Sequence, residues 1–211
     1  MATVQSVLNS ARYDLEDYQT GLIWDDTELL EYLNRMVGVL NSELAAVDSD
    51  LVEAEETSID TVADSNEVDL SSMNSGLWDS VRQVWIGSDL LTKLPLDRIR
   101  YKRMFRTASA KPSYWCLYNR KILFECPADQ AYTNLVVYYN KKIASLAVTD
   151  SMPYNDVFND LIREMLIMYA QARKDNTQAS VNAVMRNLFK RKAMEETLRR
   201  GHIPKSYYID F

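Results

Sequence analysis

A helix with a clearly marked start is the feature that most constrains the fold of this 211-residue chain. In the run Trp24-Asp25-Asp26-Thr27-Glu28-Leu29-Leu30, Asp25 and Glu28 have the spacing of a capping box, which satisfies backbone N–H groups of the first turn. Trp24 and Leu29 can pack as a hydrophobic staple. Apolar residues then recur on one helical face: Leu29, Leu30, Leu33, Met36, Val37, Leu40 and Leu44. A helix from Asp26 to about Ala46 must therefore pack against another element.

Three further segments have the periodicity of amphipathic helices: residues 3–17, residues 157–172 and Thr177–Arg200. The last of these ends before Gly201, a typical residue after a helix C-terminus. The segment 157–172 is apolar almost all round, because Leu166 and Ile167 flank its main apolar stripe. Either this helix is the centre of the domain or it also contacts another subunit.

The middle of the chain has the composition of strands and turns, with short runs of Val, Ile, Thr and aromatic residues separated by Asn, Asp, Ser and Gly. Gly87-Ser88 predicts a tight turn, and Pro95 predicts the start of a short helix that ends near Phe105. We expect strands near residues 51–59, 66–71, 80–86, 89–92, 113–118, 121–126 and 132–141.

Two cysteines lie in a predicted hairpin that turns at Asn119-Arg120. In that register Cys116 opposes Leu123, and Cys116 and Cys126 lie on opposite faces of the ribbon. We therefore expect free thiols, as in a protein made in a reducing cytosol.

These patterns predict an α+β fold that is mainly helical, in which the N- and C-terminal helix pairs form a four-helix bundle with a β-rich insert between them. The longest apolar run, Met165–Ala170, is too short to span a bilayer, and the N-terminus has no secretion signal. The expected domains are an N-terminal helical hairpin (1–48), a β-rich insert with one short helix (49–150), a C-terminal helix pair (151–201) and an extended tail that binds a partner (202–211).

Charge is unevenly distributed along the chain, whose 24 basic and 30 acidic residues give a net charge of −6. No Lys or Arg lies between Arg35 and Arg82, whereas basic residues cluster in 98–121 and 186–192. These segments can be ordinary solvated surface, and Glu195 and Glu196 can pair with the last basic cluster within one helix. Alternatively, acidic and basic faces meet between identical subunits, or the acidic face repels DNA.

The residues needed for common catalytic and metal sites are scarce. The single histidine, His202, lies in the tail, which argues against Ser/His/Asp and Cys/His nucleophiles and against histidine-rich metal sites. The two cysteines lack metal-binding spacing, and none of the five glycines forms a phosphate loop. Aromatic residues of the strands are expected in the core, because Trp115, Leu117, Ile122 and Phe124 share a face of the hairpin. We therefore predict no enzyme, no cofactor and no metal site.

The segment IWDDTELLEYLNRMVGVLNSELA resembles the N-terminal helix of head-to-tail adaptor (connector) proteins of tailed bacteriophages, in which W-[ST/D]-D-x-E-L-L-x-Y-[IL]-N recurs. The resemblance continues with a β segment, a Tyr/Trp-containing hairpin and two closing helices, and it covers most of the chain. The matching residues are Trp24, Asp26, Glu28, Leu29, Leu30, Tyr32, Leu33 and Asn34, then Val81, Val84, Ile86, Gly87 and Leu91, then Leu123, Glu125 and Pro127. The chain departs from the pattern in its long acidic stretch and in the loosely matching Pro153-Tyr154-Asn155-Asp156.

The resemblance implies a structural virion protein, made in the host cytoplasm, that forms a dodecameric ring under the portal protein and part of the DNA channel. The implied partners are further copies of the chain, the portal, tail or nozzle proteins and, by non-specific proximity, genomic DNA. No membrane partner is expected. On this view Ile203, Tyr207, Tyr208 and Phe211 bind the portal or a neighbouring subunit. The candidate residues for the interface between subunits are Leu166, Ile167, Arg186 and Lys190.

Two other classes of protein stay open. A tail-tube or head-closure protein would bind the far side of an adaptor, but such chains are mostly β, and helices at both ends of this chain argue against that class. A nucleic-acid-binding regulator could use the basic last helix, although the net charge of −6 disfavours it. An enzyme would require a pocket with strongly shifted carboxylates.

Overall fold

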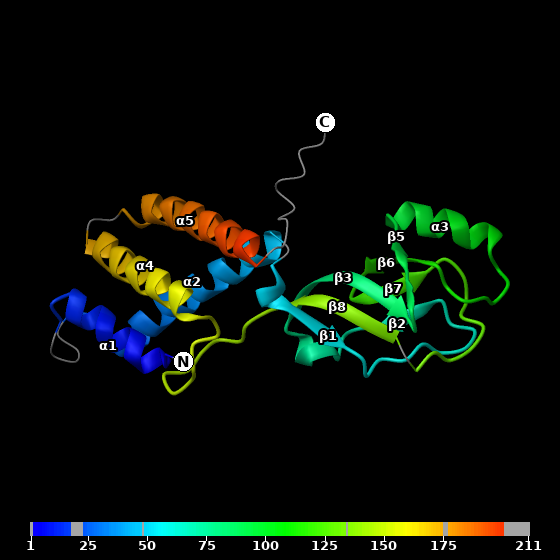
Figure 1. Ribbon diagram of the computed structural model, residues 1–211, viewed down its shortest axis with the longest axis horizontal. Coiled ribbons are helices and arrows are strands. Elements are labelled where there is room, and N and C mark those ends of the chain that lie inside the picture. The colour runs from blue at the N-terminus through cyan, green and yellow to red at the C-terminus, as the bar shows by residue number, and fades with distance from the viewer. Residues whose placement is uncertain (1, 18–22, 48, 134, 175–176, 201–211) are drawn as a thin grey trace. The chain divides into compact units, whose positions relative to one another are not determined.

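The computed structural model describes residues 2–17, 23–47, 49–133, 135–174 and 177–200, which are drawn as coloured ribbon in Figure 1. The chain divides into two compact units. The first consists of Met1–Val52 and Ile143–Phe211, and we call it the helical unit. The second, Glu53–Lys142, is the β unit.

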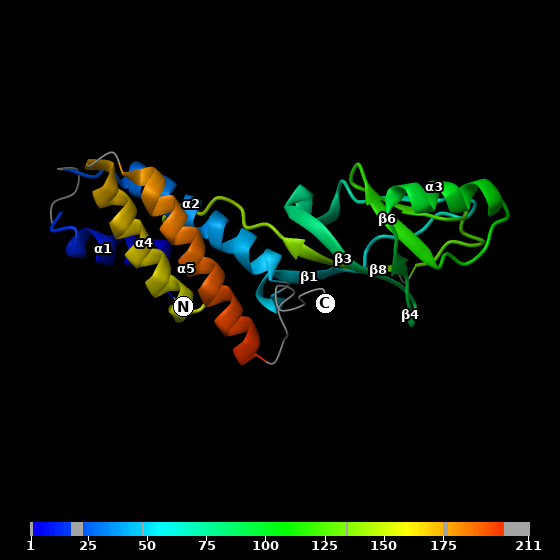
Figure 2. The same ribbon diagram turned by 90° about the horizontal axis from the view of Figure 1, so that it is seen from above.

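The helical unit contains four α-helices and one short 3-10 helix among its described residues. In both views α4 lies between α1 and α5 (Figures 1 and 2), and α2 packs on α4 and α5. Their shared core is apolar, with Trp24, Leu33, Phe158 and Phe189 among its buried side chains. The elements are α1 (Val4–Asp14), α2 (Asp26–Ala46), η1 (Asp50–Val52), α4 (Asp156–Lys174) and α5 (Gln178–Arg199).

The predicted four-helix bundle is wrong. The described residues form five α-helices and two four-stranded sheets, and the four helices of the helical unit do not have comparable lengths. At 1.5 Å per residue, the 11 residues of α1 cover only about 16 Å, whereas α2, α4 and α5 each cover about 30 Å. Three long helices pack on one another pairwise, and the short α1 packs mainly on α4.

Helix α2 begins and ends where the sequence predicts, because its N-cap and its apolar stripe are both local signals. The Asp25 side chain accepts a hydrogen bond from Thr27 N at 3.4 Å. Glu28 was expected to complete a capping box, but its carboxylate instead accepts a hydrogen bond from the Tyr32 hydroxyl and pairs with Arg173 of α4. One of the two predicted capping contacts is thus replaced by a contact between helices.

The β unit contains two sheets, with strand orders β1-β8-β3-β4 and β2-β7-β6-β5. Neighbouring strands are antiparallel except for the parallel pair β5 and β6. The expected β-rich insert is therefore present. The predicted strand 89–92 is instead two short strands, β4 and β5, which belong to different sheets. The elements are β1 (Glu53–Glu56), β2 (Glu67–Asp69), η2 (Met73–Gly76), β3 (Trp78–Ile86), β4 (Asp89–Leu90), β5 (Thr92–Lys93), α3 (Leu96–Phe105), β6 (Tyr114–Tyr118), β7 (Lys121–Phe124) and β8 (Leu135–Lys141).

The β6–β7 hairpin turns at the predicted residues. Asn119 and Arg120 have φ values of 48° and 59°, the left-handed conformation that a two-residue type I′ turn requires. The register places Cys116 opposite Leu123, as expected. Both cysteines are free and buried.

The two sheets and α3 form three layers. Trp115, Ile122 and Phe124 pack in one apolar cluster with side chains of the first sheet, including Val84 and Val137. The opposite face of the second sheet is covered by α3, whose Ile99 packs on Cys116 and Leu123. Strand alternation therefore leaves two outward surfaces on the β unit: the solvent side of α3 and the outer face of the first sheet.

Candidate functional site

The residues predicted for a subunit interface lie on two adjacent helices of the helical unit. On α4, Leu166 is fully buried in the core, and Ile167 is partly buried against it. On α5, Arg186 and Lys190 are exposed and lie one helical turn apart. The structure therefore brings the two basic candidates together on one exposed face.

Pairing within α5 was expected to neutralise its basic cluster, and this happens only for part of it. Arg191 and Lys192 both pair with Glu195, at 3.4 and 3.5 Å. Neither Arg186 nor Lys190 forms an ion pair with any residue that the structure describes. Their positive charges are thus available to another molecule.

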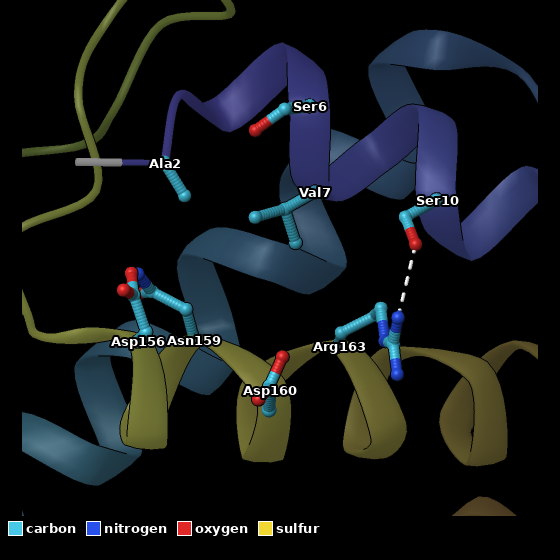
Figure 3. Close-up of a pocket in the computed structure, with 8 residues that line it drawn as sticks. All are labelled: Ala2, Ser6, Val7, Ser10, Asp156, Asn159, Asp160 and Arg163. Atoms are coloured by element: carbon cyan, nitrogen blue, oxygen red, sulfur yellow. Dashed lines mark hydrogen bonds between the residues drawn. The ribbon is translucent and has the colours of Figure 1, made fainter.

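A pocket of about 190 Å³, which was not predicted from the sequence, lies between α1 and α4 (Figure 3). Asp156 and Asp160 rise from α4 toward α1, one helical turn apart, and both are exposed. Arg163 Nη1 donates a hydrogen bond to Ser10 Oγ at 3.1 Å, which joins α4 to α1 beside the pocket. The residues that line the pocket are Ala2, Ser6, Val7, Ser10, Asp156, Asn159, Asp160 and Arg163.

These two carboxylates have no ion-pair partner within the described part of the chain, the same situation as Arg186 and Lys190. Their i, i+4 spacing was the signal in the sequence that could have identified them. The helical unit thus carries an acidic pair beside α1 and a basic pair on α5, and α4 lies between these two helices.

A buried arginine positions α1 and therefore the pocket. Arg12 donates hydrogen bonds to Asp17 Oδ2 at 2.9 Å, to the Trp24 carbonyl at 2.9 Å and to Asp26 Oδ1 at 2.5 Å. Asp17 is almost fully buried, and this guanidinium is its ion-pair partner. The contacts tie the end of α1 to the start of α2.

Helix α3 of the β unit exposes three large apolar side chains. Tyr101, Met104 and Phe105 have the i, i+3, i+4 spacing of one helical ridge and are 60%, 74% and 71% exposed. The rings of Tyr101 and Phe105 lie 5.0 Å apart. We call these three residues the α3 ridge.

Cations surround the α3 ridge and hold the helix on the sheet. Arg100 and Lys102 lie over the rings of Tyr118 and Tyr114, at 5.6 and 4.2 Å from the ring centroids. Arg103 donates from Nε to the Phe124 carbonyl at 2.7 Å. The ridge therefore sits on a firmly anchored helix with a basic border.

The groups that could support catalysis or metal binding have ordinary structural environments. Burial raises the pKa of the Cys116 and Cys126 thiols, which favours the unreactive protonated form. Across the described ranges, no cluster of three or more His, Cys, Asp or Glu side chains could hold a metal ion. No helix in those same ranges is long and apolar enough to cross a membrane.

The predicted partner-binding residues Ile203, Tyr207, Tyr208 and Phe211, like His202, lie outside the described residues. Their role stays a prediction from the sequence.

Comparison with known proteins gives one informative result. A comparison with curated proteins finds no significant match. The model of the SU10 adaptor protein family matches residues 2–204, which is nearly the whole chain and includes both units. This match agrees with the resemblance of the segment around Trp24 to head-to-tail adaptors of tailed bacteriophages. The chain therefore belongs to the SU10 adaptor protein family.

Proposed function

We propose that this adaptor is a structural component at the head-to-tail interface of the virion, where its copies form a ring under the portal and enclose part of the DNA channel. The observation that carries the ring is the pair of oppositely charged surfaces on the helical unit. Asp156 and Asp160 lie beside α1 (Figure 3), whereas Arg186 and Lys190 lie on α5. A dodecamer is the number that the family resemblance implies.

A ring of identical subunits requires two different surfaces on each subunit, because each copy contacts one neighbour with one surface and the next neighbour with the other. Both charged pairs have the same i, i+4 spacing, so two carboxylates of one copy can face two cations of the next. The α5 cations and the α4 carboxylates are exposed, and neither pair forms an ion pair with the residues that the structure describes, which favours such a contact.

The charged pairs set the register of this interface more than its total strength. A solvent-exposed ion pair contributes only about 0.2–1 kcal/mol, whereas complementary charges strongly affect orientation and partner choice. The remaining stability must come from apolar area and from closure of the ring, in which every copy has two neighbours. Ile167, which is only partly buried on α4, is a candidate for part of that apolar area.

Charge reversal tests this interface. We expect Arg186→Glu/Lys190→Glu to weaken assembly about tenfold or more, because two attractive pairs become repulsive. Asp156→Lys/Asp160→Lys should have the same effect. Combining all four substitutions should restore assembly, measured by native mass spectrometry and negative-stain electron microscopy with the portal protein present.

The matched control is Arg191→Glu/Glu195→Arg, which exchanges an ion pair on the same helix without changing its net charge. This variant should assemble like the wild type. If the four substitutions together assemble no better than either double variant, the proposed pairing is wrong, provided that circular dichroism shows each variant to be folded.

The tail and the charge pattern suggest how the ring would contact its other partners. Ile203, Tyr207, Tyr208 and Phe211 would bind the portal or an adjacent subunit, because aromatic side chains in an extended segment are efficient anchors in a groove. The absence of Lys and Arg between Arg35 and Arg82 would prevent tight binding of DNA by a channel-facing surface. Tail or nozzle proteins would bind the far side of the ring.

A further inference from the structure

The α3 ridge is an exposed apolar surface that the proposed contact between helical units does not use. Tyr101, Met104 and Phe105 are each at least 60% exposed, although Ile99 of the same helix is fully buried against the sheet. Exposed apolar residues that cluster on one ridge mark a surface for binding another protein. Arg106 at the C-cap pairs with Glu125, and Arg103 is bonded to the sheet. Arg98 and Arg100 of α3 are exposed, so a partner with a carboxylate would complement this helix.

The outer face of the first sheet has the complementary properties. Val84, Ile86, Leu135, Val137 and Tyr139 point into the core of the β unit. The residues between them, Trp85, Val136 and Tyr138, therefore point outward, and all three are only partly buried. The hydrogen bond from Trp85 Nε1 to Gln83 Oε1, 3.1 Å long, places these two side chains on the same face.

Carboxylates border this apolar sheet face. Strand β1, the edge of the sheet, has the sequence Glu-Ala-Glu-Glu and pairs with β8 so that Glu55 is opposite Tyr138. Ala54 packs on the core, so Glu53 and Glu55 lie on the outer side with Tyr138. Glu53 pairs with Arg82, while Glu55 is exposed. We call Trp85, Val136, Tyr138 and Glu55 the sheet patch.

We infer that the α3 ridge of one copy binds the sheet patch of the next copy. Each surface offers three apolar side chains, and the exposed cations Arg98 and Arg100 of α3 match the exposed Glu55 of the patch. The second sheet separates the two surfaces within one β unit, so they can meet only between copies. The contact is therefore heterologous, as ring formation requires, and the inference rests on the proposed ring.

Photo-crosslinking of the full chain, assembled with the portal protein, tests this contact. Tyr101 or Phe105 is replaced by p-benzoylphenylalanine, and the chain is mixed with ¹⁵N-labelled wild-type chain, so that a crosslink to a labelled peptide must join two copies. We expect labelled crosslinks to the peptides that contain Trp85 or Tyr138. The matched control carries the same replacement at Val62, which is 65% exposed on a loop of the same unit, and should give no crosslink to those peptides.

A second measurement uses Phe105→Asp, which changes an exposed residue and should leave the melting temperature unchanged. Loss of one apolar anchor should weaken self-assembly about tenfold or more, whereas Val62→Asp should leave it unchanged. Rings that form normally but give no labelled crosslink to the sheet patch would overturn the inference and leave the proposed function intact. Crosslinks from the ridge to portal or DNA would also overturn it, and failure to form any ring with portal would overturn both proposals.

Discussion

Replacing Arg12 by Met tests whether one buried ion pair holds α1 in place. The Arg12 and Asp17 side chains are 8% and 1% exposed. Among the described residues, removal of the guanidinium leaves the buried Asp17 carboxylate with only the Trp24 N–H, at 3.3 Å, as a donor. Removing one partner of a buried pair costs about 3–5 kcal/mol. The contact to Asp26 adds little, because that side chain is 57% exposed. We therefore expect Arg12→Met to lower the free energy of unfolding of the helical unit by about 3–5 kcal/mol.

Urea unfolding followed by circular dichroism at 222 nm measures this loss, since most of the described helical residues belong to the helical unit. The control is Arg12→Met/Asp17→Leu, which removes both charges and should recover at least half of the lost stability. A loss below about 1 kcal/mol for the single variant, or a double variant that is no more stable than the single one, would refute the assigned role of the pair.

Three further predictions concern other parts of the chain. Deleting residues 202–211 should weaken portal binding in a pull-down assay without changing the melting temperature; unchanged binding would contradict the proposed role of the tail. Glu125→Gln should destabilise the β unit by about 1–3 kcal/mol in urea unfolding. The fully buried carboxylate accepts hydrogen bonds from Ser113 N, Tyr114 N and Arg106, each at 3.0 Å. No measurable loss of stability would contradict this prediction. Burial, with a hydrogen bond to Glu28, raises the pKa of Tyr32 to about 12, and burial also raises that of Tyr154. Both pKa values of the folded state exceed the unfolded value near 10. The two protonated hydroxyls therefore contribute their full stabilisation of the folded state below pH 10, and this contribution is lost as the pH rises toward 12. Thermal melts across this range should show the decline, and Tyr32→Phe/Tyr154→Phe should make it shallower; an equally steep decline in this variant would exclude these two tyrosines as its cause.

Local signals predicted the elements of this fold well. The stripe from Leu29 to Leu44 and the cap at Asp25 determine α2, whose observed bounds equal the expected ones. The turn at Asn119-Arg120 and the register of Cys116 with Leu123 follow equally from local pattern, because a two-residue turn fixes the register and strand alternation then places Trp115 and Phe124 on one buried face.

Contacts between distant segments could not be predicted in this way. The pairing of β1 with β8 joins residues more than 80 positions apart, and β4 and β5 separate into different sheets after a break at Leu91. The expected bundle was wrong because periodicity shows that a helix has an apolar face but does not show which helices share it. For the same reason the sequence could not show that Leu166 lies in the core of its own subunit, whereas Arg186 and Lys190 lie on its surface.

The candidate surfaces illustrate the same limit. The acidic pair Asp156 and Asp160 is visible in the sequence, but only the packing of α1 on α4 makes it part of a pocket. Likewise Tyr101, Met104 and Phe105 are apolar residues at helical spacing in the sequence, and only the placement of Ile99 against the sheet shows that the ridge faces outward.

We propose that copies of this adaptor close into a ring through two different surfaces. Electron microscopy of the purified full chain with its portal protein, combined with the mass of the complex from native mass spectrometry, tests this most directly. We predict closed rings with a single rotational symmetry and a mass that corresponds to a whole number of subunits on the portal. A portal complex that carries only isolated adaptor monomers, or open filaments of variable length, would contradict the claim.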